Sequence, residues 1–188
     1  MAIKATVFKA NLQIADMDRH YYAEHALTLS QQPSETDERM MVRLLAFALH
    51  AHEYLEFAQG MTDDESADLW QKDLTGVIEL WIDVGLPDEK LIRKACGRAK
   101  QVFVYCYGGR AAQMWFDQNS NQFGRLKNLT IISLAQESTR AMAALAQRNM
   151  TLQCNIQEGQ VWLMDDKQNV TVEYMALKTA DAVELKVR

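Results

Sequence analysis

The fold follows from one stretch of sequence, Val77-Ile78-Glu79-Leu80-Trp81-Ile82-Asp83-Val84, which is followed directly by Gly85-Leu86-Pro87. Residues two apart in a strand share a face, so Ile78, Leu80, Ile82 and Val84 are expected to form a purely aliphatic face that belongs to a core. Gly85 ends the strand, and Pro87 suits the first turn of a helix. This stretch therefore predicts a core strand that leads into a helix.

The neighbouring segments extend this prediction. Asp68-Leu69-Trp70-Gln71 and a turn from Asp73 to Gly76 precede the strand, which predicts a β-hairpin. A helix is expected over about 87–100, and the apolar residues 101–107 are typical of a buried strand. We predict that 77–84 and 101–107 are neighbouring inner strands, covered by helices at 35–55 and 87–100.

The remaining segments alternate strands with helices. Strands are expected at 2–16 and 25–31, and Ser34 is expected to cap the helix at 35–55. A helix is expected from about 110, a strand at 129–134 and another helix at 135–148. Strands are expected at 150–177, with turns at 158–159 and 165–169. This order predicts one domain, 1–188, of the α/β (α+β) class: a central mixed sheet flanked by helices, with C-terminal β-hairpin strands.

Composition excludes several classes of protein. The 188 residues are 48% apolar and 24% charged, as in an ordinary globular protein. There is no apolar run of membrane-spanning length and no unbroken apolar N-terminal stretch, so we expect a cytoplasmic protein without a membrane partner. The three cysteines form no CxxC pair. The net charge of −5 does not indicate a nucleic-acid binder, although a local basic patch stays open.

Carboxylates mark the other face of the predicted strand. Glu79 and Asp83 share this face with Trp81, but they are about 13 Å apart along the strand and cannot bind one ion by themselves. Asp68, on the facing strand, is a natural third ligand, and Mg²⁺ is held by one or two carboxylates together with water and phosphate. Asp68, Glu79 and Asp83 are therefore candidate metal ligands. Alternatively, this face is simply exposed to solvent.

Other charged residues add weaker signals. Glu38 lies at the edge of the core face of its helix, where it is a candidate site residue or merely a first-turn acid. Lys90, Lys94 and Arg98 share a face of the helix at 87–100 and could contact phosphates, or form its solvated side. Arg110 follows Gly108-Gly109 at a helix start, which suits an anion or a tight turn.

Several sequence blocks together resemble the YaeQ family of bacterial proteins along nearly the whole chain. The blocks are Pro33-Ser34-Glu35-Thr36, Glu38-Arg39-Met40-Met41, Leu80-Trp81-Ile82-Asp83-Val84-Gly85-Leu86-Pro87-Asp88-Glu89, Lys94-Ala95-Cys96 and Arg110-Ala111-Ala112-Gln113. That family is similar in fold to the PD-(D/E)XK, restriction endonuclease-like nucleases, and its biochemical function is not established. The resemblance implies a compact core with the order helix, hairpin, strand, helix, strand.

The resemblance also implies roles for particular residues. Asp68 would match the first acid of the nuclease motif, Asp83 the second acid and Glu38 the acid of the first helix. Gly85 stands where the motif has lysine, and Lys94, or less well Lys90, would supply that cation from the following helix. Glu38, Asp83 and Lys94 would then be catalytic, and Mg²⁺ the cofactor.

Two hypotheses about function remain open. The first is a Mg²⁺-dependent nuclease or phosphodiesterase that acts on nucleic acid, with Lys90, Lys94, Arg98 and Arg110 contacting phosphates. The second is a non-catalytic module on the same fold that binds nucleic acid or a protein. The acids favour the first hypothesis, whereas Gly85 and the acidic composition favour the second. The sequence leaves the protein partner and the oligomeric state open.

Overall fold

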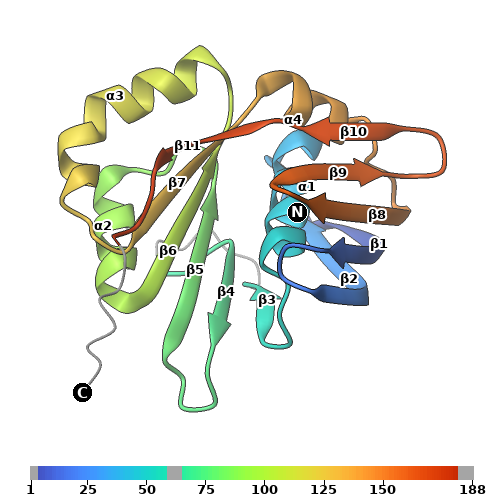
Figure 1. Cartoon of the computed structure of the whole chain (residues 1–188), viewed down its shortest axis with the longest axis horizontal. Helices are drawn as coiled ribbons and strands as arrows, with labels where there is room; N and C mark the ends of the chain where they lie inside the picture. Colours follow the sequence, from blue (N-terminus) through green and yellow to red (C-terminus); the bar gives the residue numbers. More distant parts are fainter. Residues whose placement is uncertain (1–3, 59–64, 182–188) are drawn as a thin grey trace.

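A computed structural model of the chain describes residues 4–58 and 65–181. These residues form a mixed α+β fold with two sheets (Figure 1). In the first half of the chain the elements are β1 (Thr6–Asp16), β2 (Tyr21–Gln31), α1 (Asp37–His50), β3 (Leu55–Phe57), β4 (Leu69–Lys72), β5 (Ile78–Val84) and α2 (Glu89–Arg98). In the second half they are β6 (Ala99–Cys106), α3 (Arg110–Gly124), β7 (Leu129–Leu134), α4 (Gln136–Ala143), β8 (Asn149–Gln157), β9 (Gln160–Met164), β10 (Asn169–Val172) and β11 (Tyr174–Lys178).

The first sheet, here called the terminal sheet, joins strands from both ends of the chain in the order β10-β9-β8-β1-β2. β1 pairs with β2 as an antiparallel hairpin and with β8 in parallel, so that Lys9 lies opposite Asn149. Along β1 the buried residues Phe8, Ala10, Leu12 and Ile14 alternate with exposed polar ones. This alternation is typical of a sheet that is buried on one face only.

The second sheet, here called the hairpin sheet, has the order β11-β7-β6-β5-β4-β3. β4 and β5 form the expected antiparallel hairpin, and β5, β6 and β7 run parallel. The prediction that 77–84 and 101–107 are neighbouring inner strands is confirmed, because Ile82 lies opposite Phe103 and both strands have a second neighbour. The prediction of one central sheet was wrong, because the first strands and most of the C-terminal strands form a second sheet.

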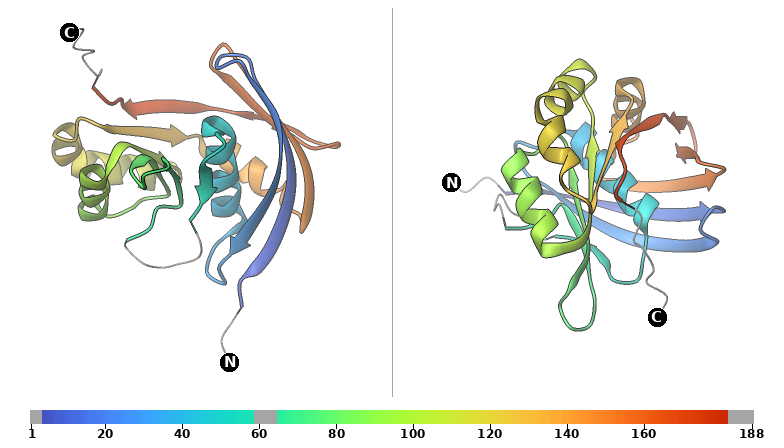
Figure 2. Two further views of the ribbon diagram at one scale, coloured as in Figure 1. Left: turned by 90° about the horizontal axis from the view of Figure 1, so that it is seen from below. Right: turned by 60° about the vertical axis from the view of Figure 1, so that its left-hand side comes forward.

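Helix α1 lies between the two sheets, and the terminal sheet curves around it (Figure 2). Residues 40–48 are buried without interruption, so this helix is covered on all sides rather than on the single face expected. Thr36, not Ser34, is the N-cap, because its hydroxyl oxygen accepts a hydrogen bond from the Arg39 amide at 3.1 Å. The helix ends at His50, before the predicted limit of 55, since Leu55 begins β3.

The other face of the hairpin sheet is covered by α2 and α3 (Figure 1). Trp81 is only 3% exposed there, so the alternative of a solvent-exposed face is wrong for this residue. Ile78 packs in the same cluster as Trp81, whereas Leu80, Ile82 and Val84 pack toward α1. An irregularity in the β4–β5 register at Gln71 and Lys72 breaks the alternation at this end of the hairpin. Among the described residues, no helix combines the length and apolar character that crossing a membrane requires.

Candidate functional site

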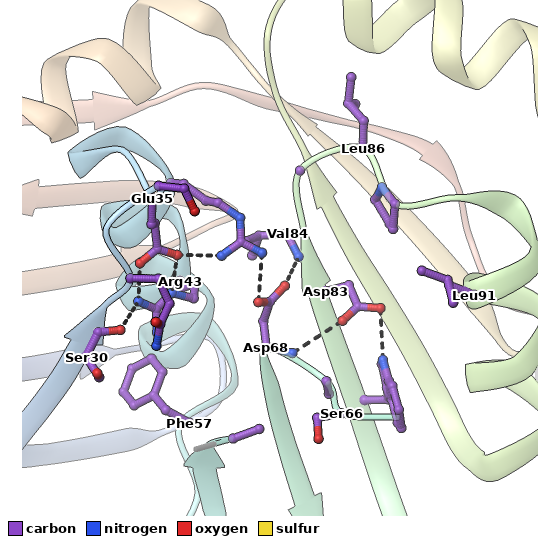
Figure 3. A pocket seen from close by; sticks show the side chains of 18 of the residues that line it. Ser30, Glu35, Arg43, Phe57, Ser66, Asp68, Asp83, Val84, Leu86 and Leu91 are labelled. Atoms are coloured by element: carbon purple, nitrogen blue, oxygen red, sulfur yellow. Dashed lines mark hydrogen bonds and ion pairs between the residues drawn. The ribbon is translucent and has the colours of Figure 1, made fainter. Parts of the chain in front are cut away.

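A cleft of about 1190 Å³ opens where the two sheets meet the start of α1. One wall comes from the end of β2 and the residues before α1, and the other from the segment before β4 and the end of β5 (Figure 3). Asp68, Asp83 and Gly85 lie in its lining, together with Arg39 and Arg43 of α1. The cleft therefore gathers charged groups from three segments that are far apart in the sequence.

The hairpin register places Asp68 beside Asp83. Leu69 lies opposite Ile82, so Asp68, which precedes β4, lies next to Asp83, which follows Ile82 in β5. The Asp68 amide donates to Asp83 Oδ1 at 3.3 Å, and the Val84 amide donates to Asp68 Oδ2 at 2.8 Å. Two of the three predicted metal ligands are thus neighbours at one end of the hairpin, as the sequence suggested for this pair.

The carboxyl group of Asp83 lies in an unusual environment. Burial, with the neighbouring charge of Asp68 adding to it, raises the pKa of Asp83 to about 7. Hydrogen bonds from the Trp81 indole, 2.9 Å from Oδ2, and from the Asp68 amide act in the opposite direction. Asp83 therefore exchanges a proton near neutral pH, where a cation could replace that proton.

An arginine–glutamate network faces the two aspartates, and the sequence reasoning missed it (Figure 3). Arg39 Nη2 donates to Asp68 Oδ1 at 2.8 Å, and Arg39 Nη1 donates to Glu35 Oε2 at 2.5 Å. Arg43 donates to both carboxylate oxygens of Glu35, at 3.0 and 2.5 Å, and to the Ser30 carbonyl oxygen at 3.1 Å. One glutamate thus fixes two guanidinium groups, of which that of Arg39 also binds Asp68.

Charge and burial explain how these arginines behave. Burial by itself would lower the pKa of Arg39. The charges of Asp68 and Glu35 and their hydrogen bonds outweigh burial, so the pKa of Arg39 lies above its ordinary value. The side chain of Arg43 is only 8% exposed, within an otherwise apolar stretch of α1. The spacing of Glu35, Arg39 and Arg43 by four residues in the sequence was the available signal for this network, although Glu35 precedes the N-cap of α1.

Two of the predicted acids lie elsewhere. Glu38 accepts a hydrogen bond from the Thr139 hydroxyl of α4 at 2.8 Å and is not part of the cleft lining. Glu79, at the opposite end of β5 from Asp83, forms an ion pair with Lys100 at 2.7 Å. The structure therefore brings neither Glu38 nor Glu79 to the pair of aspartates.

The predicted phosphate-contacting residues lie beside the cleft or away from it. Lys94 and Arg98 both pair with Glu65, and the Arg98 guanidinium also lies 5.1 Å from the centre of the Trp81 ring. Lys90 is exposed and lines a smaller hollow of about 370 Å³ beyond Pro87. Arg110 is exposed at the first residue of α3. None of these four residues lines the larger cleft.

At Gly85, where the resemblance noted above would place a lysine, the backbone disfavours a side chain. Its φ of +94° belongs to the left-handed region that side chains disfavour, and its amide donates to the Tyr105 carbonyl oxygen at 2.9 Å. A lysine at this position would strain the backbone. Of the two arginines in the cleft lining, Arg39 is the more exposed, at 33% against 8% for Arg43.

The acids fit a metal ion only in a minimal way. Within residues 4–58 and 65–181 there is no group of three or more histidine, cysteine, aspartate or glutamate side chains that could hold a metal. Asp68 and Asp83 are two adjacent carboxylates, and each of their oxygens accepts one hydrogen bond and keeps a further lone pair. Two carboxylates, completed by water and a substrate phosphate, match the way proteins hold Mg²⁺.

Known proteins resemble this chain over nearly its whole length. A family model described as YaeQ protein matches residues 1–174. A protein of Escherichia coli (strain K12), described as uncharacterized protein YaeQ, is 44% identical over 176 residues, which cover 94% of this chain and 97% of the relative. A Salmonella typhi protein of the same description is 41% identical with the same coverage.

Solved structures agree with the sequence comparison. The crystal structure of the YaeQ protein from Xanthomonas axonopodis pv. citri is 50% identical and superposes with a TM-score of 0.89, covering 93% of this chain and 98% of that one. The YaeQ protein from Pseudomonas syringae is 31% identical, with a TM-score of 0.88, and covers 93% of this chain and 97% of that one. The descriptions of these relatives name no activity. The shared sequence and fold show that the chain belongs to the YaeQ family.

Proposed function

We propose that the cleft is a phosphodiester site in which Asp68 and Asp83 hold Mg²⁺ and Arg39 contacts the phosphate, so that the protein acts as a metal-dependent phosphodiesterase related to nucleases. The observation that carries this proposal is the adjacency of the two aspartates, with the Arg39 guanidinium 2.8 Å from Asp68 in the same cleft. With β3 and β4 taken as the hairpin, the elements α1, β3, β4, β5, α2 and β6 also follow one another in the order helix, hairpin, strand, helix and strand that resemblance to PD-(D/E)XK nucleases implies.

Each group has a part in this proposal that its surroundings support. When bound, Mg²⁺ would polarise the phosphate and lower the pKa of a coordinated water. Arg39, fixed by Glu35, offsets the charge that develops on the phosphate oxygens. Asp83 releases its proton when a cation binds, because the proton and the cation compete for the same oxygens. Arg43 holds Glu35 in place.

A non-catalytic binding module is the second candidate, and two observations favour it. No lysine lines the cleft among the described residues, and the backbone at Gly85 disfavours one. Lys94, which the resemblance made the substitute, pairs with Glu65. In this case the cleft binds a phosphate-bearing ligand through Arg39 and does not cleave it.

Metal titration followed by a cleavage assay tests the proposal. Mg²⁺ and Mn²⁺ binding is measured by calorimetry for the native protein, Asp68→Asn, Asp83→Asn and the matched control Glu79→Gln. Bis(p-nitrophenyl) phosphate and short single- and double-stranded DNA and RNA then serve as substrates. We expect binding and cleavage that Asp68→Asn and Asp83→Asn abolish and Glu79→Gln preserves.

The remaining outcomes separate the candidates. Metal binding without cleavage by the native protein would leave the binding module, and the absence of both would contradict the metal site. Arg39→Met and Lys94→Met distinguish the two possible cations. Loss of cleavage in Arg39→Met alone supports the assignment above, whereas loss in Lys94→Met alone would return the role to the helix after the hairpin.

A further inference from the structure

We propose that the cleft takes a short phosphodiester with a single phosphate, of dinucleotide size, rather than a nucleic-acid duplex. This inference rests on the proposed phosphodiester site and adds the substrate class. Three features of the described residues support it: the number of cations that a ligand can reach, the charges around the cleft, and the nature of its walls.

The cleft offers one reachable cation. Arg39 and Arg43 are the basic side chains among the described residues that line it. Arg43 is buried, and Glu35 and the Ser30 carbonyl already bind its guanidinium. Arg39 is 33% exposed and is the guanidinium that a ligand can meet. One such group suits one phosphate.

The basic residues of α2, which lie beside the cleft, do not form a track for a phosphate backbone in the described part of the chain. Lys94 and Arg98 are engaged by Glu65, and Arg93 lies 3.7 Å from Glu89. Beyond Leu86 and Pro87 the surface continues into the smaller hollow, whose lining includes Asp88 and Glu89 as well as Lys90. Duplex DNA carries one charge per about 1.7 Å and needs many contacts of this kind. The chain, with a net charge of −5, would repel it.

The walls of the cleft suit a small organic body on each side of a phosphate. Figure 3 shows Asp68 and Asp83 between Phe57, of β3, and Leu91, of α2. Phe57 is half-buried, with the Phe47 ring stacked against it at 5.5 Å and the Arg43 guanidinium 5.8 Å from its centre, so it offers a base an aromatic edge, and Leu91 offers an aliphatic surface. The volume of about 1190 Å³ lies slightly above the range of about 300–1000 Å³ that is usual for small-molecule sites.

Calorimetry with three ligands tests the inference in the presence of Ca²⁺, which occupies oxygen sites. The ligands are the dinucleotide TpT, with one phosphodiester, a 12-nucleotide single strand and the 12-base-pair duplex, each titrated at several salt concentrations. We expect TpT and the single strand to bind within about threefold of each other and the duplex at least tenfold more weakly. For TpT, the slope of log K against log salt should be about −1 or shallower.

Variants assign the salt dependence to one residue. Arg39→Met should remove most of the affinity for TpT, whereas the matched control Lys94→Met should leave it unchanged. Tighter binding of the duplex, with a slope of about −4 or steeper that still depends on Arg39 and Asp83, would overturn the size inference and leave the phosphodiester site standing. No binding of any of the three ligands would overturn the proposed function and this inference with it.

Discussion

An ion pair between a basic and an acidic side chain lies near each end of strand β5, and the two pairs have different surroundings. At one end Arg39 approaches Asp68 to 2.8 Å, and these side chains are 33% and 19% exposed. At the other end Lys100 approaches Glu79 to 2.7 Å, and these side chains are 61% and 32% exposed. The distances are nearly equal, whereas the exposure of the side chains differs.

This difference distinguishes a partly buried network of charges from an exposed ion pair on the surface. Exposed ion pairs contribute little, because water and salt screen them. The cleft end continues inward to Glu35 and Arg43, whose side chains are only 7% and 8% exposed, and its charges cannot be satisfied by water if a partner is lost. Removing a charged partner should therefore destabilise the fold more at the cleft end than at the other end, and the following variants test this expectation.

The largest expected effect is that of Arg43→Met. The variant leaves the buried Glu35 with one guanidinium partner instead of two and the Ser30 carbonyl oxygen without its bond to Arg43. Breaking a buried pair in this way costs about 3–5 kcal/mol of the free energy of unfolding. Urea denaturation measures it. A loss below about 1 kcal/mol would show that the inner network is no more important than a surface pair.

The second effect is a pH dependence that Asp83 causes. Its pKa is about 7 in the folded protein, above its ordinary value of 3.8, so between pH 4 and 7 the native state binds more protons than the unfolded state. The free energy of unfolding should therefore fall as pH rises through this window, by about 1–3 kcal/mol, and be constant above it as far as Asp83 is concerned.

Asp83→Asn should remove this part of the slope. Asparagine has one acceptor oxygen and cannot accept from both the Trp81 indole and the Asp68 amide, so the substitution itself also changes the stability. The quantity to compare is therefore the slope of the free energy of unfolding against pH, and not the stability at one pH. Glu79→Gln is the matched control at the other end of the strand and should leave the slope as it is. Equal slopes for the native protein and Asp83→Asn would contradict the buried-acid description.

A smaller effect separates two glycines that both have open space where a Cβ would lie. Gly85, in the cleft, has a φ of +94°, whereas Gly97 lies within α2. Gly85→Ala should destabilise the fold by about 1–2 kcal/mol, and Gly97→Ala should stabilise it by about 0.5 kcal/mol. Thermal denaturation of both variants checks the opposite signs. If Gly85→Ala were neutral, backbone strain would not explain why lysine is missing from this position.

The smallest effect is expected at the exposed end of β5. Glu79 raises the pKa of Lys100 through a hydrogen bond and its charge, but the pair lies on the surface, where water screens it. Lys100→Ala should therefore leave the denaturation midpoint within experimental error at physiological salt. A shift as large as that of Arg43→Met would remove the distinction between the two ends.

The sequence predicted the elements of the hairpin sheet better than their assembly. Alternation and turn residues located β4, β5 and β6 because these signals are local. The pairing of β1 with β8 depends on residues at opposite ends of the chain, and no local pattern encodes it. For the same reason the sequence showed one apolar face of α1 but not the second sheet that covers its other sides.

The candidate site divides in the same way. Asp68 and Asp83 could be placed on facing strands from the hairpin alone, but the register shift between Gln71 and Lys72, which no local pattern shows, decides that these two residues meet. Glu35, Arg39 and Arg43 were missed, because charged residues at the start of a helix usually face water, and here they face a cleft between two sheets. Glu79 was grouped with Asp83 because they share a strand, but the length of β5 separates them.

The position of α1 also bears on how the protein is made. The helix is enclosed on one side by the terminal sheet, in which β1 and β2 pair with each other but depend on β8 to extend the sheet. A two-stranded hairpin is marginal in water. While a ribosome has not yet synthesised the strand that begins at Asn149, the apolar helix lacks much of its cover. Folding is therefore completed only after β8 has been synthesised, and a nascent chain that stops before β8 offers a chaperone a hydrophobic segment to bind.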